Sequence, residues 1–488
     1  IPAALAQVSA WTGVPLDRIT ARYEQDRSKG RSFDPILLLT DMPFEQVAPI
    51  EAELYKWPGL RVVTHSRRYY PEGEAFSHIL GYVAEASEKE LAEDPDLSLG
   101  DMVGRQGLES VLEKRLRGQK GLYRLEVDVL GRPLSRTLVE SPHMGQNVTL
   151  SIDSRLQHAV MEAMGDYSGS VVVMDPDSGK LLALVTRPAY DNNIFIGGLS
   201  TRDWNALRND PRFPLQNRAI QSAYPAGSVW KLMMVGMLLE HGISPQEKVY
   251  CPGYFKLGNH TFRCWRRGGH GAVDMEHSLI YSCDVYFYTM SVRLGINNME
   301  PFARACGYGS ETGIDLPYET SGLVPSRDWK KRRFGESWQQ GDTVNASIGQ
   351  GHVLVTPLQT AVFLSSLING GYLLKPQLMA DAPREVRARS PISDAHRAWI
   401  KNAMIQTVEA TGATARVLKR KDMTIGGKTG TAQVVKIKMD GYRRVKTAEM
   451  EFRQRDHAWI GSWGEKDGKR VVVVTMIEHG GGGGAVAG

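Results

Sequence analysis

The stretch Tyr224-Pro225-Ala226-Gly227-Ser228-Val229-Trp230-Lys231 opens the segment that decides how this chain folds. Proline and glycine end a loop, and serine is a favoured N-cap of a helix. The helix predicted from Ser228 to Leu239 is apolar on all sides, which is typical of a helix buried on every face. Lys231 therefore lies inside a buried helix, one turn after Ser228 on the same face.

A buried lysine is costly unless it has a task, so Lys231 is a candidate catalytic group. Burial disfavours the charged ammonium and makes a neutral amine available as a base, and the nearest hydroxyl belongs to Ser228. The start of the helix also stabilises negative charge that develops near Ser228. The alternative is an N-cap serine followed by a lysine whose amine reaches solvent, and this motif alone does not exclude it.

Two further motifs follow along the chain. Ser282-Cys283-Asp284 begins 54 residues after Ser228 in a predicted helical region, and Lys428-Thr429-Gly430-Thr431 begins 146 residues after Ser282, before a predicted strand at 433–437. Each triplet alone is common, whereas the ordered set is not. Together the motifs favour a catalytic serine assisted by lysines.

Strand-forming segments lie at both ends of the region that begins near residue 150, and helices are predicted between them at 225–415. The remaining predicted strands are 170–174, 180–185, 457–463 and 470–477. The last contains four consecutive valines, apolar on both faces, as in a central strand. This arrangement predicts an α+β fold in which helices cover an antiparallel sheet.

The composition is that of a soluble globular protein with two or three domains in its 488 residues, since 42% of them are apolar and 23% are charged. It excludes a disordered chain and a disulfide-dense mini-protein. The net charge of +5 is too small to predict nucleic-acid binding. Residues 1–145, with a capping box at Ser87-Glu88-Lys89-Glu90 and a helix at 106–116, lack a catalytic grouping. We expect a non-catalytic domain there and a catalytic domain over residues 146–488.

The three ordered motifs resemble those of penicillin-binding proteins, the serine acyltransferases that penicillin recognises. Gly313-Ile314-Asp315-Leu316-Pro317 and Ser321-Gly322-Leu323-Val324-Pro325-Ser326 resemble the class B, elongation-specific penicillin-binding protein 2 family. Arg68-Tyr69-Tyr70-Pro71 and Gly104-Arg105-Gln106-Gly107-Leu108-Glu109 resemble the non-catalytic region of that family. The resemblance covers nearly the whole chain. It implies a transpeptidase domain with a five-stranded antiparallel sheet, preceded by an elongated mixed α/β pedestal or dimerisation domain.

The resemblance implies a serine-type D,D-transpeptidase that cross-links peptidoglycan during cell elongation and shape maintenance. The substrate is a stem peptide ending in D-Ala-D-Ala, and the acyl-enzyme is one that β-lactam antibiotics also form. Ser228 is implied as the nucleophile, Lys231 as the base, and Ser282 as the relay of protons to the leaving amine. Lys428 and Thr429 are implied to hold the substrate carboxylate. The backbone of Ser228 and Thr431, beside Gly430, is implied to form the oxyanion hole.

Asp284 departs from the asparagine that many relatives carry at the third position of the middle motif. A carboxylate beside Lys231 favours the charged amine and opposes the effect of burial, and Lys428 partly offsets this. Because the elongation subfamily contains such aspartate variants, we expect an active enzyme in which Asp284 belongs to the catalytic site.

Three other functions are compatible with the same fold. A β-lactamase needs a second general base, for which Glu311 and Glu319 are candidates that no motif marks. A non-catalytic regulator with this fold is disfavoured because the motif serine and lysines are intact. A division-specific class B transpeptidase is disfavoured by the Ser-Cys-Asp triplet and by the residues at 322–326.

Localisation and partners are also implied by the resemblance. No stretch reaches the roughly 18 apolar residues that span a bilayer, and no signal peptide is visible. The family's membrane anchor is expected before Ile1, with this chain at the periplasmic face of the inner membrane. Residues 1–145 are expected to contact a SEDS-family glycosyltransferase, and no organic cofactor is expected.

Cys251, Cys264, His270 and Cys283 are spaced by 13, 6 and 13 residues in one loop-rich segment between the two motif serines. Three thiolates and an imidazole fit a closed tetrahedral zinc site. The resemblance supports this, since members of the elongation subfamily carry a structural zinc here. We expect the zinc to hold the middle motif from behind, because Cys283 lies between its two polar residues.

Two alternatives to zinc stay open. Cys251 and Cys264 could form a disulfide in an oxidising compartment, or the cysteines could be unlinked and buried. His260 is a possible substitute ligand for His270, although His270 fits the subfamily spacing better. Cys306 lies outside the pattern and is expected to be a buried apolar residue.

Overall fold

The computed structural model describes residues 1–27, 36–40, 42–64, 67–98, 100–129, 133–196, 198–434, 439–440, 443–444 and 449–488. These residues form two compact units. Unit 1 comprises Ile1–Gly73, Leu80–Asn147 and Asp191–Asn205. Unit 2 comprises Glu74–Ile79, Val148–Tyr190 and Ala206–Gly488.

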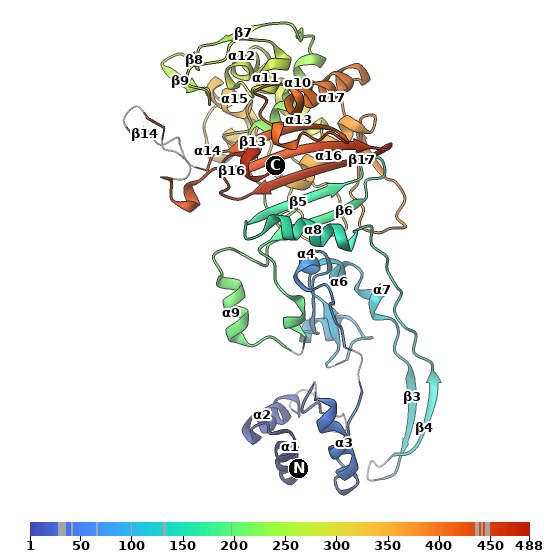
Figure 1. Ribbon diagram of the computed structural model, residues 1–488. Helices are drawn as coiled ribbons and strands as arrows, with labels where there is room; N and C mark the ends of the chain where they lie inside the picture. The colour runs from blue at the N-terminus through green and yellow to red at the C-terminus, as the bar shows by residue number, and fades with distance from the viewer. Residues whose placement is uncertain are drawn as a thin grey trace. The chain divides into compact units, whose positions relative to one another are not determined.

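Unit 1 contains short helices and two small antiparallel strand pairs (Figure 1). Its elements are α1 (Pro2–Thr12), α2 (Leu16–Arg27), α3 (Phe44–Glu53), β1 (Val83–Glu85), α5 (Glu88–Glu93), β2 (Met102–Gly104), α6 (Gly107–Val111), α7 (Glu113–Arg117), β3 (Leu122–Val127) and β4 (Pro133–Glu140). The capping box predicted at Ser87 is confirmed, since its hydroxyl accepts from the N–H of Glu90. The helix predicted at 106–116 is instead two helices, because Leu112 leaves helical geometry.

Unit 2 is built on a five-stranded antiparallel sheet in the order β13-β16-β17-β5-β6 (Figure 1). The strands are β5 (Gly169–Met174), β6 (Leu181–Arg187), β13 (Thr424–Ala432), β16 (His457–Lys466) and β17 (Lys469–Ile477). This confirms the predicted α+β fold. The valine-rich strand is central, and Val472 and Val474 are fully buried.

The strand predicted at 433–437 does not include Gln433 and Val434, and the motif before it is itself a strand. β13 ends at Ala432, so the Lys428-Thr429-Gly430-Thr431 motif lies within the strand and not before it. Gln433 and Val434 follow the strand, and 435–437 lie outside the described residues. The prediction failed because the glycines of the motif resemble a loop, whereas nine residues of β13 pair with β16.

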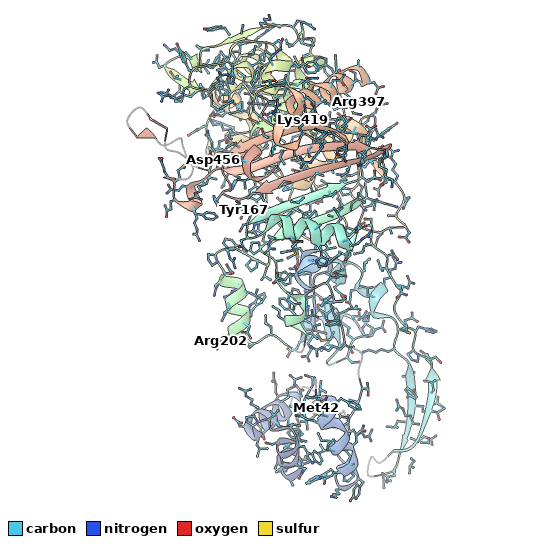
Figure 2. The ribbon with its side chains drawn as sticks, viewed as in Figure 1. Met42, Tyr167, Arg202, Arg397, Lys419 and Asp456 are labelled. Atoms are coloured by element: carbon cyan, nitrogen blue, oxygen red, sulfur yellow. The ribbon has the colours of Figure 1, made fainter. Side chains whose placement is uncertain are left out.

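Helices cover both faces of this sheet. α8 (Ser154–Met164) packs through Leu156, Val160 and Met164 on the face that carries Val171 and Val173. α16 (Pro357–Ile368) and α17 (Asp394–Glu409) contact the other face, against β5, β17 and β13. Side chains fill the layers between helices and sheet (Figure 2). Arg397 of α17, labelled there, is buried and donates to the carbonyl of Ile392.

The Ser228 segment differs from prediction at its start. A 3₁₀ turn, η4 (Gly227–Trp230), precedes α10 (Lys231–Glu240), whose residues from Lys231 to Leu239 are buried. Ala226 is the N-cap, so the prediction that Ser228 is an N-cap is wrong. The N-cap lies two residues earlier than predicted, and Gly227, the first residue of the turn, has a positive φ of 53°, which glycine adopts readily. The Ser228 hydroxyl is therefore not used for capping.

In the sequence, most of the rest of unit 2 lies between β6 and β13. This region is mostly helical and also contains short strands. Its elements are α11 (Met275–Ile280), α12 (Asp284–Leu294), α13 (Ile296–Ala305), α14 (Arg327–Phe334), α15 (Gln340–Ala346), β7 (Val249–Cys251), β8 (Tyr254–Leu257), β9 (His260–Arg263), β10 (Gly271–Val273), β11 (Tyr372–Leu374) and β12 (Val386–Arg389). Across the described part of the chain, no helix combines the length and the apolar character needed to cross a membrane.

Candidate active site

Three elements bring the motif residues together in unit 2. Ser228 lies in η4, Ser282 lies between α11 and α12, and Lys428 lies in β13. The Ser282 hydroxyl oxygen accepts hydrogen bonds from Lys428 Nζ at 2.9 Å and from Lys231 Nζ at 3.3 Å. Because both of its lone pairs are engaged, the hydroxyl hydrogen is available to a substrate or to Ser228.

Lys231 is fully buried, as predicted, and its amine is not isolated, because it has hydrogen-bond partners in the site. Its Nζ donates to Asp284 Oδ1 at 2.7 Å and to the Ser282 carbonyl at 3.0 Å, in addition to the Ser282 hydroxyl. These three bonds account for all three ammonium hydrogens. Burial alone favours the neutral amine, whereas the ion pair with Asp284 favours the charged ammonium.

Ser228 is half-buried and lies one 3₁₀ turn before Lys231. The backbone N–H of Lys231 donates to the Ser228 carbonyl, which fixes the spacing between the two residues. Within the described residues, the Lys231 amine bonds to Ser282 and Asp284 and not to the Ser228 hydroxyl.

Lys428 is the second fully buried lysine of the site. Its Nζ donates to the Thr429 carbonyl at 3.0 Å as well as to Ser282. Burial and the positive charge of Lys231 together lower the pKa of Lys428 well below its usual range, against the opposing effect of Asp284. Lys428 thus binds its proton less tightly than an exposed lysine does.

Asp284 is buried at the start of α12, where its second oxygen accepts the backbone N–H of Trp265 at 2.9 Å. Burial raises the pKa of the Asp284 carboxyl, although Lys231 and this N–H counteract the rise. The Trp265 indole also donates to the carbonyls of Tyr281 and Ser282 at 3.0 and 3.1 Å. Sequence analysis missed Trp265, and its position directly after Cys264 was the available signal.

Ser282 has a positive φ of 53°, an uncommon conformation for a residue with a side chain. Such strain persists where the surroundings fix it, often at functional sites. Here the Ser282 N–H donates to the Leu279 carbonyl at 3.2 Å, and its carbonyl accepts from Lys231 and Trp265.

The substrate-binding residues expected from sequence lie on β13 beside η4. Thr429 is buried and Thr431 is exposed. A side chain at Gly430 would meet Trp459 Cβ at 3.0 Å and the Ala226 carbonyl at 3.3 Å. Glycine is thus what allows β13 to approach the turn that carries Ser228.

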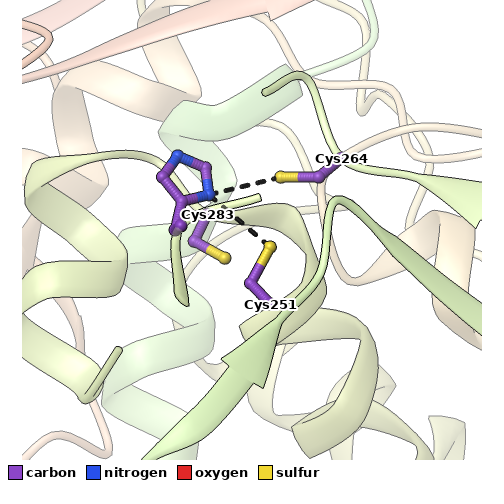
Figure 3. A group of neighbouring side chains, drawn as sticks. Cys251, Cys264 and Cys283 are labelled. Carbon is purple, nitrogen blue, oxygen red and sulfur yellow. Dashed lines mark hydrogen bonds between the residues drawn. The ribbon is translucent and has the colours of Figure 1, made fainter. Parts of the chain in front are cut away.

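The predicted metal ligands form a cluster behind the middle motif (Figure 3). The ligand atoms of Cys251, Cys264, His270 and Cys283 all lie within 4.8 Å of one another. His270 Nδ1 lies 3.6 Å from the sulfurs of both Cys251 and Cys264. A hydrogen bond from Cys283 lowers the pKa of the Cys264 thiol and raises that of Cys283.

This donor set fits a tetrahedral zinc ion. With ligand distances of about 2.0–2.3 Å, neighbouring ligand atoms of such a site lie about 3.5–3.8 Å apart. All four cysteines of the chain are free, so the Cys251–Cys264 disulfide, which was an alternative to zinc, is absent. His260 is exposed on β9 and is not part of the cluster, and Cys306 is buried elsewhere, as expected.

The two candidate bases of a β-lactamase do not mark a second catalytic group. Glu319 accepts from the backbone N–H groups of Thr312 and Gly313 at 2.7 and 2.9 Å and from the Thr312 hydroxyl. It therefore organises its own loop. Glu311 is exposed.

The motif geometry and the five-stranded sheet define a serine acyltransferase with a penicillin-binding fold. Residues 169–488 match the penicillin-binding protein transpeptidase domain, and residues 2–150 match the penicillin-binding protein dimerisation domain. The chain belongs to the penicillin-binding protein transpeptidase family, and it is an enzyme of that family. This confirms the resemblance expected from the motifs.

The similar proteins are of the penicillin-binding protein 2 kind. The peptidoglycan D,D-transpeptidase MrdA of Haemophilus influenzae is 34% identical, over 96% of this chain and 74% of that protein. The penicillin-binding protein 2 of Helicobacter pylori, solved in a complex with MreC, has a TM-score of 0.88 at 29% identity and covers 99% of this chain and 88% of its own. That of Pseudomonas aeruginosa, solved with WCK 5153, has a TM-score of 0.75 at 32% identity, with 88% and 89% covered.

Proposed function

We propose that this protein cross-links peptidoglycan stem peptides ending in D-Ala-D-Ala during cell elongation, through an acyl-enzyme on Ser228. The observation that carries the proposal is the chain of hydrogen bonds from Lys231 through the Ser282 hydroxyl to Lys428, one turn from Ser228. It joins three motifs into one proton-exchanging site. The names of the MrdA relatives support the same reaction.

In the acylation step, Lys231 first passes one proton to Asp284, a carboxyl whose pKa is raised by burial, and the free amine then takes the Ser228 proton. The Ser228 oxygen attacks the carbonyl carbon between the two D-alanines. The ester bond forms, the C–N bond breaks, and the leaving amine takes a proton through Ser282. Lys428 can resupply that proton because its amine bonds to the same hydroxyl. The N–H groups of Ser228 and Thr431 stabilise the oxyanion, each contributing about 3 kcal/mol.

In the transfer step, an amine of a neighbouring stem peptide attacks the ester carbonyl. A new amide bond forms and the ester bond breaks, and the proton that the incoming amine loses passes through the lysine pair to the Ser228 oxygen. Lys428 and Thr429 hold the terminal carboxylate of the donor peptide in the first step. A β-lactam enters the same sequence and stops at the ester.

Intact-mass measurement after incubation with a β-lactam tests the proposal. The unmodified chain should gain one acyl group, and Ser228→Ala should gain none while keeping its thermal unfolding midpoint. An acylated peptide that contains Ser282 instead of Ser228 would overturn the assignment.

We also propose a structural zinc ion held by Cys251, Cys264, His270 and Cys283. When bound, it would supply a fixed cross-link between the segment that carries Trp265 and the middle motif, and no chemical step. Cys283 lies between Ser282 and Asp284, and Trp265 follows Cys264 directly. Cys264 is thus next in the sequence to Trp265, which donates hydrogen bonds to the Ser282 carbonyl and to the Asp284 carboxylate.

The proposed location is the periplasmic face of the inner membrane, and the proposed partner of unit 1 is a SEDS-family glycosyltransferase. A similar chain, with a TM-score of 0.76 at 30% identity, was solved in work on polymerization and crosslinking by a peptidoglycan synthase complex. In unit 1, β3 and β4 expose Leu122, Tyr123, Leu125, Leu134, Leu138 and Val139. Exposed apolar side chains of this kind support a protein-binding role.

A further inference from the structure

A glycine-flanked turn after α15 contacts two elements of the active site. Gly349 and Gly351 have φ values of 67° and 70°, and Gln350 between them is buried. The N–H of Gly349 donates to the Ala346 carbonyl at 3.0 Å, and that of Gln350 donates to the Asn345 carbonyl at 3.1 Å. The turn is therefore fixed to the end of the helix.

The first contact is with the residue before Ser228. The Gly227 N–H donates to the Gly349 carbonyl at 3.0 Å. A Cβ atom at Gly349 would lie 2.5 Å from the Gly227 oxygen, so the backbones of the two residues are in direct contact. The Gly227 oxygen and the Ser228 N–H belong to one planar peptide unit, and the turn thus orients the first donor of the oxyanion hole.

The second contact is with the strand that supplies the other donor. Gln350 Nε2 donates to the Thr431 carbonyl at 3.2 Å. β13 is an edge strand of the sheet, with β16 on one side. The N–H and C=O groups of one residue in an antiparallel strand point to the same side. Because Gln350 holds the Thr431 carbonyl, the Thr431 N–H also faces away from β16, on the side where the Thr431 oxygen lies close to Gly227 of η4.

We propose that Gln350 is a positioning residue of the oxyanion hole. Together with the Gly349 carbonyl, its side-chain amide sets the separation of the Ser228 and Thr431 N–H groups. The inference rests on the proposed function, in which these two groups bind the oxyanion. Gln350 acts through Thr431 and touches no reacting atom. Donors of this kind work only at about 2.7–3.1 Å from the oxyanion, and an error of about 1 Å costs about 100-fold in rate.

Gln350→Glu tests the clamp because it keeps the side-chain size, removes both N–H donors and turns a carboxylate towards the Thr431 carbonyl. The acylation rate constant with a penicillin should fall about 10- to 100-fold. The dissociation constant of the complex that precedes acylation should change by less than about twofold. Deacylation should slow by a similar factor, since the same oxyanion forms again.

Gln359→Glu is the matched control. Gln359 is also buried, and its Nε2 donates to the carbonyls of Ser310 and Ser321 at 2.8 Å, in the same unit. This variant should lose thermal stability and keep the acylation rate constant. In the infrared spectrum, the ester carbonyl stretch of the penicilloyl-enzyme should move to a higher wavenumber for Gln350→Glu only. A purely structural role would lower the unfolding midpoint and leave that stretch unchanged.

Gln350→Met removes the donor without adding charge and should give the same loss of rate if the glutamate variant does not fold. An unchanged rate constant and an unshifted stretch in either folded variant would overturn the role of Gln350. In that case the proposed function would still stand, provided that Ser228→Ala gains no acyl group. Labelled Ser228→Ala would instead overturn the proposed function itself.

Discussion

At the residue scale, the site depends on two buried lysines that share one hydroxyl. Lys231 is neutralised by Asp284 at 2.7 Å, whereas Lys428 contacts no carboxylate and its pKa is lowered well below its usual range. Because their surroundings differ, the two lysine amines are suited to different roles. Lys231 is held in place beside Ser228, and Lys428 binds its proton more weakly than an exposed lysine does.

Lys428→Met should make the protein more stable at neutral pH. The unfolded chain binds a proton on Lys428 that the folded chain binds more weakly, so wild-type stability is lost as the pH falls from 10.5 to the lowered pKa. Lys428→Met removes this loss, so the free energy of unfolding at pH 7 should rise. Urea unfolding at several pH values measures it.

The gain should shrink as the pH rises towards 10.5, where both states lose the proton. Lys421→Met, at an exposed lysine, should change the stability little at any pH. If the difference in stability between the wild type and Lys428→Met stayed constant across this pH range, the prediction would be wrong.

His270→Ala should lower the zinc content from about one ion per chain, because three ligands hold a structural zinc poorly. Elemental analysis of protein purified without a His-tag measures this. The acylation rate should fall in parallel, because the middle motif loses its support. His260→Ala is the control, since that imidazole is exposed and outside the cluster. An unchanged zinc content in His270→Ala, or none in the wild type, would count against the site.

At the element scale, close backbone contacts between a turn, a 3₁₀ turn and a strand build the site. Gly349 lies against Gly227, and a Cβ atom at Gly227 would lie 2.8 Å from the Thr431 oxygen. Side chains at either position would separate elements that must stay within hydrogen-bonding range. The glycines are thus required by proximity as well as by their positive φ.

Gly349→Ala and Gly335→Ala separate these two requirements. Both glycines have φ near 70°, but a Cβ atom at Gly335 meets nothing within 4 Å. Gly335→Ala should cost about 1–2 kcal/mol of unfolding free energy and leave acylation unchanged. Gly349→Ala should cost more and slow acylation at least about tenfold, because it displaces Gly227. Equal effects of the two variants on stability and rate would refute the proximity argument.

At the scale of the whole molecule, the chain separates chemistry from the proposed partner binding. All residues of the three motifs belong to unit 2, and β3 and β4 with their exposed apolar side chains belong to unit 1. Changes on these strands should therefore affect a partner and leave the acylation site intact.

Leu125→Glu on β3 should reduce glycan polymerisation by the SEDS-family partner several-fold, because it places a charge on an apolar surface. Polymerisation is measured with lipid-linked precursor in the reconstituted pair, and acylation by a fluorescent penicillin in the same samples. Lys421→Glu, on the surface of unit 2, is the control and should alter neither. Full polymerase activity with Leu125→Glu and with Leu134→Glu would remove the proposed surface.

The α+β class, the family and the residues of the motifs could be predicted from the sequence alone, because these follow from local patterns. An apolar helix around Lys231 and four valines in β17 specify burial without knowledge of partners. The four residues of the Cys/His cluster could likewise be predicted, since their spacing is local to one segment and the cluster forms as expected.

The way in which the motifs meet depends on tertiary packing and could not be predicted from the sequence. The bonds of Ser282 to Lys428, of Trp265 to Asp284 and of Gln350 to Thr431 join residues that no local pattern connects. The strand at Lys428 was placed too late because its glycines favour a loop, and pairing with β16 overrides that preference. Hydrogen-bond partners and proton affinities depend on distances between segments far apart in the chain, and packing alone fixes those distances.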